Sequence, residues 1–100
     1  MKENIKALNN KSVESSLGWR VDILSIDCFQ YSQGSKTIKL EIEDHPDAGG
    51  ELEWIIYLPA HWIWNDVNHG ELIAPEKVSE ILSRIEMAFW KLDMKIKEYV

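Results

Sequence analysis

The spacing of apolar residues predicts two adjacent strands in the middle of the chain. Lys36–Asp44 and Glu51–Leu58 both alternate with the period of two that is typical of a strand with one buried face. The apolar residues that share a face are Ile38, Leu40 and Ile42 in the first segment and Leu52, Trp54, Ile56 and Leu58 in the second. Residues 45–50, His-Pro-Asp-Ala-Gly-Gly, are rich in turn formers, so we expect a hairpin.

A period of 3.6 predicts one long amphipathic helix from Pro75 to about Leu92. Its apolar stripe consists of Val78, Ile81, Leu82, Ile85, Ala88, Phe89 and Leu92. Met87 and Trp90 fall outside this stripe, so either the amino-terminal segment covers them or they contact a partner or a second copy. After Asp93 the period returns to two, which predicts a closing strand.

The amino-terminal third is less regular. Residues 3–17 carry apolar side chains at roughly helical spacing before Gly18, which predicts a short helix. Trp19–Phe29 is rich in β-branched and aromatic residues and predicts a strand, followed by a turn at residues 31–35. We therefore expect one α+β domain over residues 1–100. It would have an antiparallel sheet of three to four strands, one long helix packed on it, a C-terminal strand and a short N-terminal helix.

The composition of the 100 residues, 45% hydrophobic and 28% charged, is typical of a globular domain. The apolar runs are shorter than the ~20 residues that span a membrane, and the first residues do not resemble a secretory leader. Cys28 is the single cysteine, so no disulfide forms within the chain. These features predict a cytoplasmic protein that does not contact a membrane.

Negative charge is concentrated in one segment. Six of the 17 acidic residues lie within residues 41–53, which contain no Lys or Arg, and the other eleven balance the eleven Lys and Arg of the chain. Such a segment repels nucleic acid and anionic membranes and attracts basic proteins. We therefore expect a basic protein partner and no direct binding of nucleic acid.

Strand alternation predicts how these acids are arranged. If Ile42 lies opposite Leu52, Glu43 faces Glu51 and Glu41 faces Glu53 on the other side of the hairpin. The resulting anionic patch is either a solubilising hairpin tip or a binding surface. Trp62 and Trp64 either pack in the core or add aromatic anchors to that surface. The candidate partner-binding residues are Glu41, Glu43, Asp44, Asp47, Glu51, Glu53, Trp62 and Trp64.

Candidates for catalysis are few. His61, Asp66 and His69 bring two imidazoles and a carboxylate close together in sequence, but their spacing matches no known metal-ligand pattern. Asp44, Asp47 and Glu51 likewise do not match a calcium loop. Cys28 lies on a predicted strand, where a buried small hydrophobe is expected. We expect no catalytic residue, metal or cofactor, and keep as the alternative a small metal-dependent or hydrolytic enzyme that uses His61, Asp66 and His69.

A small acidic α+β chain with a concentrated anionic segment at residues 41–53 and the run His-Trp-Ile-Trp at residues 61–64 resembles, in type, the immunity proteins of bacterial polymorphic and contact-dependent toxin systems. The resemblance implies a protein that binds a cognate toxin domain, often a basic nuclease, and blocks its active site or substrate surface. A structural adaptor that dimerises through Met87 and Trp90 is the other alternative.

Overall fold

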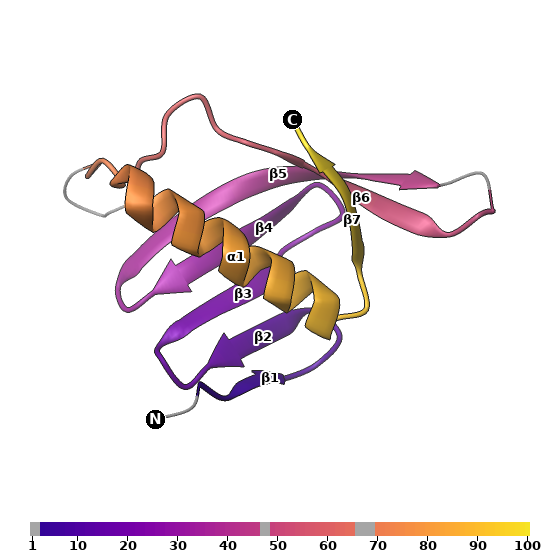
Figure 1. Ribbon diagram of the computed structural model, residues 1–100, viewed down its shortest axis with the longest axis horizontal. Helices are drawn as coiled ribbons and strands as arrows, with labels where there is room; N and C mark the ends of the chain where they lie inside the picture. The colour runs from indigo at the N-terminus through magenta and orange to yellow at the C-terminus, as the bar shows by residue number, and fades with distance from the viewer. Residues whose placement is uncertain (1–2, 47–48, 66–69) are drawn as a thin grey trace.

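One mixed sheet and one helix make up the described part of the chain. The computed structural model describes residues 3–46, 49–65 and 70–100 (Figure 1). The elements are β1 (Ile5–Ala7), β2 (Ser12–Ser15), β3 (Trp19–Ile23), β4 (Cys28–Gln33), β5 (Lys36–Pro46), β6 (Leu52–Tyr57), α1 (Pro75–Lys91) and β7 (Lys95–Tyr99). The strands lie in the sheet in the order in which they occur in the sequence. All neighbours are antiparallel except β6 and β7, which are parallel because α1 connects them.

The fold is α+β, but the predicted sheet of three to four strands is wrong, because the described residues form a sheet of seven. Residues 3–17 form β1 and β2 instead of a helix. The side chain of Asn9 accepts a hydrogen bond from the Lys11 amide at 2.7 Å, and this local turn separates the two strands. The predicted strand Trp19–Phe29 is also divided, since β3 ends at Ile23 and β4 begins at Cys28.

The predicted long helix is confirmed, and α1 covers one face of the sheet (Figure 1). Ile81, Ile85, Ala88 and Phe89 are fully buried against that face, and each large apolar side chain buried this way contributes about 1.5–3 kcal/mol. The buried sheet residues include Val13, Trp19, Val21, Phe29, Tyr31, Ile38, Leu40, Ile42 and Ile56. Among the described residues, no helix is both long and apolar enough to cross a bilayer.

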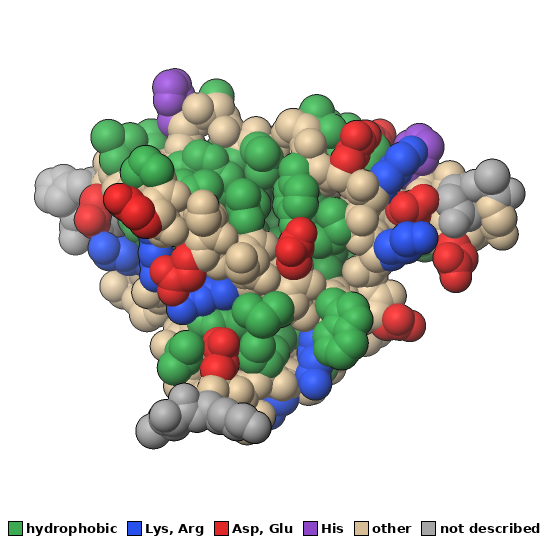
Figure 2. Space-filling view, in the orientation of Figure 1, with side chains coloured by type: hydrophobic (Ala, Val, Ile, Leu, Met, Phe, Trp, Pro, Cys, Tyr) green, Lys and Arg blue, Asp and Glu red, His purple; other side chains and the backbone are tan. Residues whose placement is uncertain are grey.

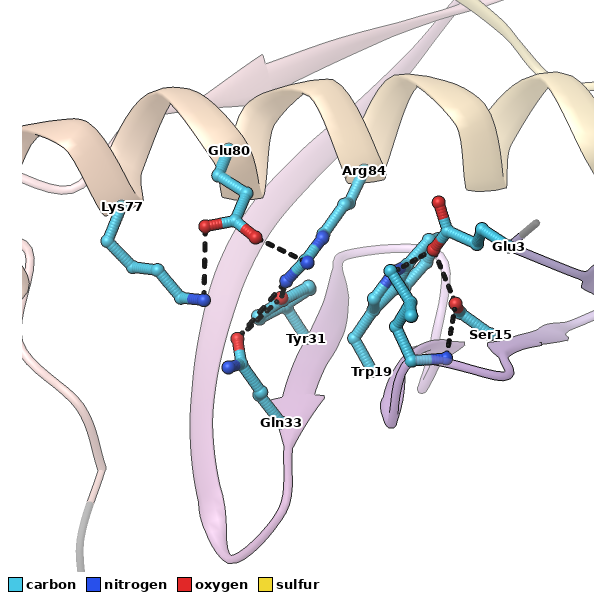
Figure 3. A network of polar contacts seen from close by, with 9 residues as sticks. Glu3, Ser15, Trp19, Tyr31, Gln33, Lys77, Glu80 and Arg84 are labelled. Carbon is cyan, nitrogen blue, oxygen red and sulfur yellow. Dashed lines mark hydrogen bonds and ion pairs between the residues drawn. The ribbon is translucent and has the colours of Figure 1, made fainter. Parts of the chain in front are cut away.

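Arg84 joins the helix to the sheet through polar contacts (Figure 3). Its guanidinium donates to the Tyr31 hydroxyl at 2.8 Å and to Oε1 of Gln33 at 3.2 Å. It also forms an ion pair with Glu80 and lies 5.7 Å from the centre of the Trp19 ring. Because the Arg84 side chain is only 12% exposed, these contacts are largely shielded from water.

Glu3 holds the amino-terminal segment against the sheet (Figure 3). Its carboxylate accepts hydrogen bonds from Nε1 of Trp19, at 2.6 Å, and from the Ser15 hydroxyl. Trp19 is 1% exposed, so its indole N–H needs a partner inside the protein. The amino-terminal segment supplies that partner.

The β5–β6 hairpin forms as predicted, but its predicted register is wrong by four residues. Ile42 lies opposite Ile56 and not Leu52, so Glu41 faces Tyr57 and Glu43 faces Ile55. Both registers preserve the alternation of side chains, and alternation alone therefore does not distinguish them. The observed register buries Ile56 completely and avoids two facing pairs of like charges.

Candidate protein-binding site

The candidate site lies on the face of the sheet that α1 does not cover. On β5, Leu40 and Ile42 point to the helix and are buried, whereas Glu41 and Glu43 alternate with them and are exposed on the opposite face. Two carboxylates are thus held on one side of a rigid strand. We call this side of the sheet the open face.

Tyr57 lies between these acids on the neighbouring strand. It faces Glu41 across the ladder, and its hydroxyl donates a hydrogen bond to Glu43 at 2.6 Å. This hydrogen bond, together with desolvation and the negative charges of Glu43, Glu41 and Glu98, raises the pKa of Tyr57. The phenol therefore remains a neutral donor at physiological pH and fixes the Glu43 carboxylate.

The β3–β4 turn and the start of β4 complete the site. Cys28 faces Glu41 on β5, and the backbone oxygen of Asp27 accepts a hydrogen bond from the Ile42 amide at 2.8 Å. A shallow depression of about 440 Å³ is lined by Asp27, Cys28, Glu41, Ile42, Glu43 and Tyr57. We call it the acidic depression.

Nearer the hairpin tip, one lysine of β7 compensates an acid and a second lies beside a histidine. Lys95 lies 3.9 Å from Glu53, and the ammonium group of Lys97 lies 3.5 Å from Nδ1 of His45. For Asp27, Glu41 and Glu43, in contrast, the described part of the chain supplies no ion pair. Asp27, Glu41 and Glu43 therefore bring three carboxylates to the acidic depression without an ion pair from the described residues.

The structure brings together only some of the predicted partner-binding residues. Glu41 and Glu43 line the acidic depression, and Glu53 lies on the same face beside Lys95. Asp44 faces Trp54 and therefore belongs to the helix side of the sheet. Glu51 is an exposed residue just before β6, and Asp47 lies outside the described residues.

The two candidate tryptophans do not belong to the acidic depression. Trp64 is 5% exposed and stacks on Tyr31, with 6.2 Å between ring centres, so its side chain is part of the core. Trp62 is half-buried against the core. It lines a separate apolar cleft beside the amino-terminal end of α1. Figure 2 shows hydrophobic side chains gathered on that side of the molecule, between α1 and the loop after β6.

The alternative catalytic group is only partly described. His61 is exposed beside the apolar cleft, and Asp66 and His69 lie outside the described residues. Within residues 3–46, 49–65 and 70–100, no cluster of three potential metal ligands occurs. Cys28 is half-buried on the open face and not in the core, in contrast to the expectation from the sequence.

Sequence reasoning did not identify Asp27, Cys28, Tyr57 or Glu98 as part of a binding surface. Tyr57 shares its strand parity with Glu53, which is visible in the sequence, but its place beside Glu43 depends on the register. Glu98 approaches only because β7 runs parallel to β6, where it faces Ile55. The arrangement of the site therefore comes from strand pairing and not from a motif.

Comparison of the chain with protein-family models finds no match, and comparisons with curated proteins and with solved structures find none either.

Proposed function

We propose that this protein is a protein-binding inhibitor of the immunity type, which neutralises a cognate basic toxin domain in the cytoplasm by binding it through the open face. The observation that carries the proposal is the acidic depression, where Glu41 and Glu43 are fixed on a strand without a basic partner among the described residues. The proposal includes no catalytic step and no cofactor.

The charge on the open face suits fast association with a cationic protein. Carboxylates held on one side of a strand create a concentrated negative potential, which steers an oppositely charged partner and raises the association rate. Lys and Arg side chains of the partner would form the ion pairs with Glu41 and Glu43 that the described residues of this chain do not provide. If the toxin is a nuclease, the same carboxylates would occupy a surface that the toxin uses for phosphates.

Tyr57 gives this surface an aromatic component. Tyrosine is enriched at binding hot spots because it provides both apolar contact area and a polar group. The Tyr57 ring is half-buried at the edge of the acidic depression, and its hydroxyl is already bonded to Glu43. An arginine of the partner would therefore meet a carboxylate and an aromatic ring together, which favours a guanidinium group.

The test begins with affinity capture of the partner from the native cell and continues with measured association rates for the purified partner. Replacing both Glu41 and Glu43 by Gln should slow association about tenfold or more at low salt, with a smaller effect at ~1 M salt. The matched control removes two other charges, by Asp44→Asn on the helix side of β5 and Glu76→Gln on α1. We expect this control to change the rate less than about twofold.

Equal effects of the two double variants would show that the open face is not the binding surface. A captured partner that is not basic would also contradict the proposal. The inhibitory role itself predicts that co-expression of this protein restores growth of cells that express the partner. Continued growth arrest in the presence of the complex would exclude neutralisation.

A further inference from the structure

The outward face of α1 exposes the largest uncovered aromatic side chain among the described residues. Trp90 is 79% exposed, and Met87, one turn earlier on the same side, is 38% exposed. The amino-terminal segment does not cover them, because its strands join the sheet as β1 and β2. We refer to Met87 and Trp90 together as the helix patch.

Charged residues flank the helix patch on both sides in a specific order. Glu86 directly precedes Met87, and Lys91 directly follows Trp90. In a parallel pair of helices, Met87 and Trp90 would take the two central positions of a heptad. Glu86 would then lie beside Lys91 of the other helix, which is the spacing of interhelical ion pairs. All four side chains are exposed.

We propose that the helix patch is the contact surface between two copies of this chain, with their α1 helices side by side and in the same direction. In this arrangement Trp90 and Met87 pack against the same residues of the second copy, and two Glu86–Lys91 ion pairs flank them. Ser83, one turn before Met87, is small and exposed, and it allows the helices to approach closely.

The charges around the helix patch favour a second copy over the basic partner of the open face. One acid and one base flank the patch, so it is locally neutral and self-complementary, whereas the acidic depression has unbalanced negative charge. Moreover, α1 covers the face of the sheet opposite the open face (Figure 1). A dimer through α1 therefore leaves both acidic depressions accessible.

The size of the contact predicts a weak dimer. A buried tryptophan contributes roughly 150–250 Å², so two tryptophans and two methionines form an interface below the ~1,200 Å² at which stable complexes begin. We expect a dissociation constant of tens to hundreds of micromolar. Sedimentation equilibrium of the full chain between about 5 µM and 1 mM measures it directly.

Three variants test the contact. Trp90→Ser should raise the dissociation constant about tenfold or more, whereas Leu72→Ser, at a 74% exposed leucine outside α1, should leave it unchanged. Lys91→Glu should raise it about threefold or more, because it places like charges opposite each other twice in the dimer. Adding Glu86→Lys to Lys91→Glu should restore the wild-type value to within about twofold.

A chain that remains monomeric at ~1 mM would overturn the inference. So would an equal effect of Trp90→Ser and Leu72→Ser, which would indicate nonspecific association of apolar surface. If the variant with both Glu86→Lys and Lys91→Glu has a dissociation constant as high as that of Lys91→Glu alone, the two helices do not pair in the proposed direction. None of these results depends on the partner of the open face, so the two proposals are tested separately.

Discussion

Arg84 links α1 to three residues of the sheet that lie far from it in sequence, and its removal should measurably weaken the fold. Arg84→Met retains much of the apolar stem but removes the guanidinium that bonds to Tyr31 and Gln33 and lies over Trp19. A hydrogen bond from a charged group is worth about 1.5–3 kcal/mol, a cation–π contact about 0.5–1 kcal/mol, and a partly exposed helix pair about 0.3–0.5 kcal/mol.

These contributions overlap, so we expect the free energy of unfolding to fall by about 2–4 kcal/mol, a large part of the ~5–15 kcal/mol that is typical of a domain. Urea unfolding followed by tryptophan fluorescence measures this change, with an unchanged slope. Lys77→Met is the matched control. Lys77 also bonds to Glu80, at 3.2 Å, but within the described part of the chain it contacts no sheet residue by hydrogen bond or ion pair. Its loss should therefore cost about 0.5 kcal/mol or less.

A loss below ~1 kcal/mol for Arg84→Met would refute this reasoning, because it would show that water replaces the guanidinium without penalty. An equally large loss for Lys77→Met would refute it too, since the effect would then come from the helix surface and not from the link to the sheet.

Three further predictions concern single substitutions elsewhere in the fold. Glu3→Ala leaves the Trp19 indole N–H without its acceptor and should lower the free energy of unfolding by about 1–3 kcal/mol in urea titrations. Gly34 has φ = 61° and open space around it, so Gly34→Val should cost about 1–2 kcal/mol through backbone strain, and Asn at this position should be better tolerated in the same assay. Glu43→Gln should lower the raised pKa of Tyr57 toward its ordinary value, measured by ultraviolet absorbance of the phenolate. Because the folded-state pKa of Tyr57 is raised, the stabilisation from the Glu43 bond is fully present below about pH 10 and lost as the pH rises through the folded-state value; a Glu43→Gln variant with an unchanged pKa would contradict this assignment.

The long helix, the hairpin strands and the closing strand could be predicted because each has one clear period in the sequence. In contrast, the helical spacing within residues 3–17 places Ile5, Leu8, Val13 and Leu17 on one face. Leu8 and Leu17 are exposed, at 42% and 55%, and of the four only Val13 is fully buried. Short strands bury few residues each, so their pattern is easily mistaken for a helical one. Pairing with β3 determines the structure of this segment, and local preference does not.

The candidate site was predicted less completely than the fold. The alternation of β5 correctly separates Glu41 and Glu43 from the core. It does not determine the register with β6, since a shift by an even number of residues keeps the same side chains on the same face. The position of Tyr57 beside Glu43 therefore required the structure. The burial of Trp64 against Tyr31 likewise required the structure, because it depends on the path of the segment that follows β6.

The strands lie in the sheet in the same order as in the sequence, and this order affects how the chain folds during synthesis. From β1 to β6, each strand pairs with the strand made just before it, so the meander grows by short-range contacts as the chain emerges. The last pairing differs, because β7 is synthesised only after all of α1 and can pair with β6 only then. During that interval the outer edge of β6, with Ile55 and Ile56, lacks its neighbour and is open to intermolecular pairing. Slow translation or premature termination within α1 would prolong this interval, and pairing with β7 covers the β6 edge once that strand has been made.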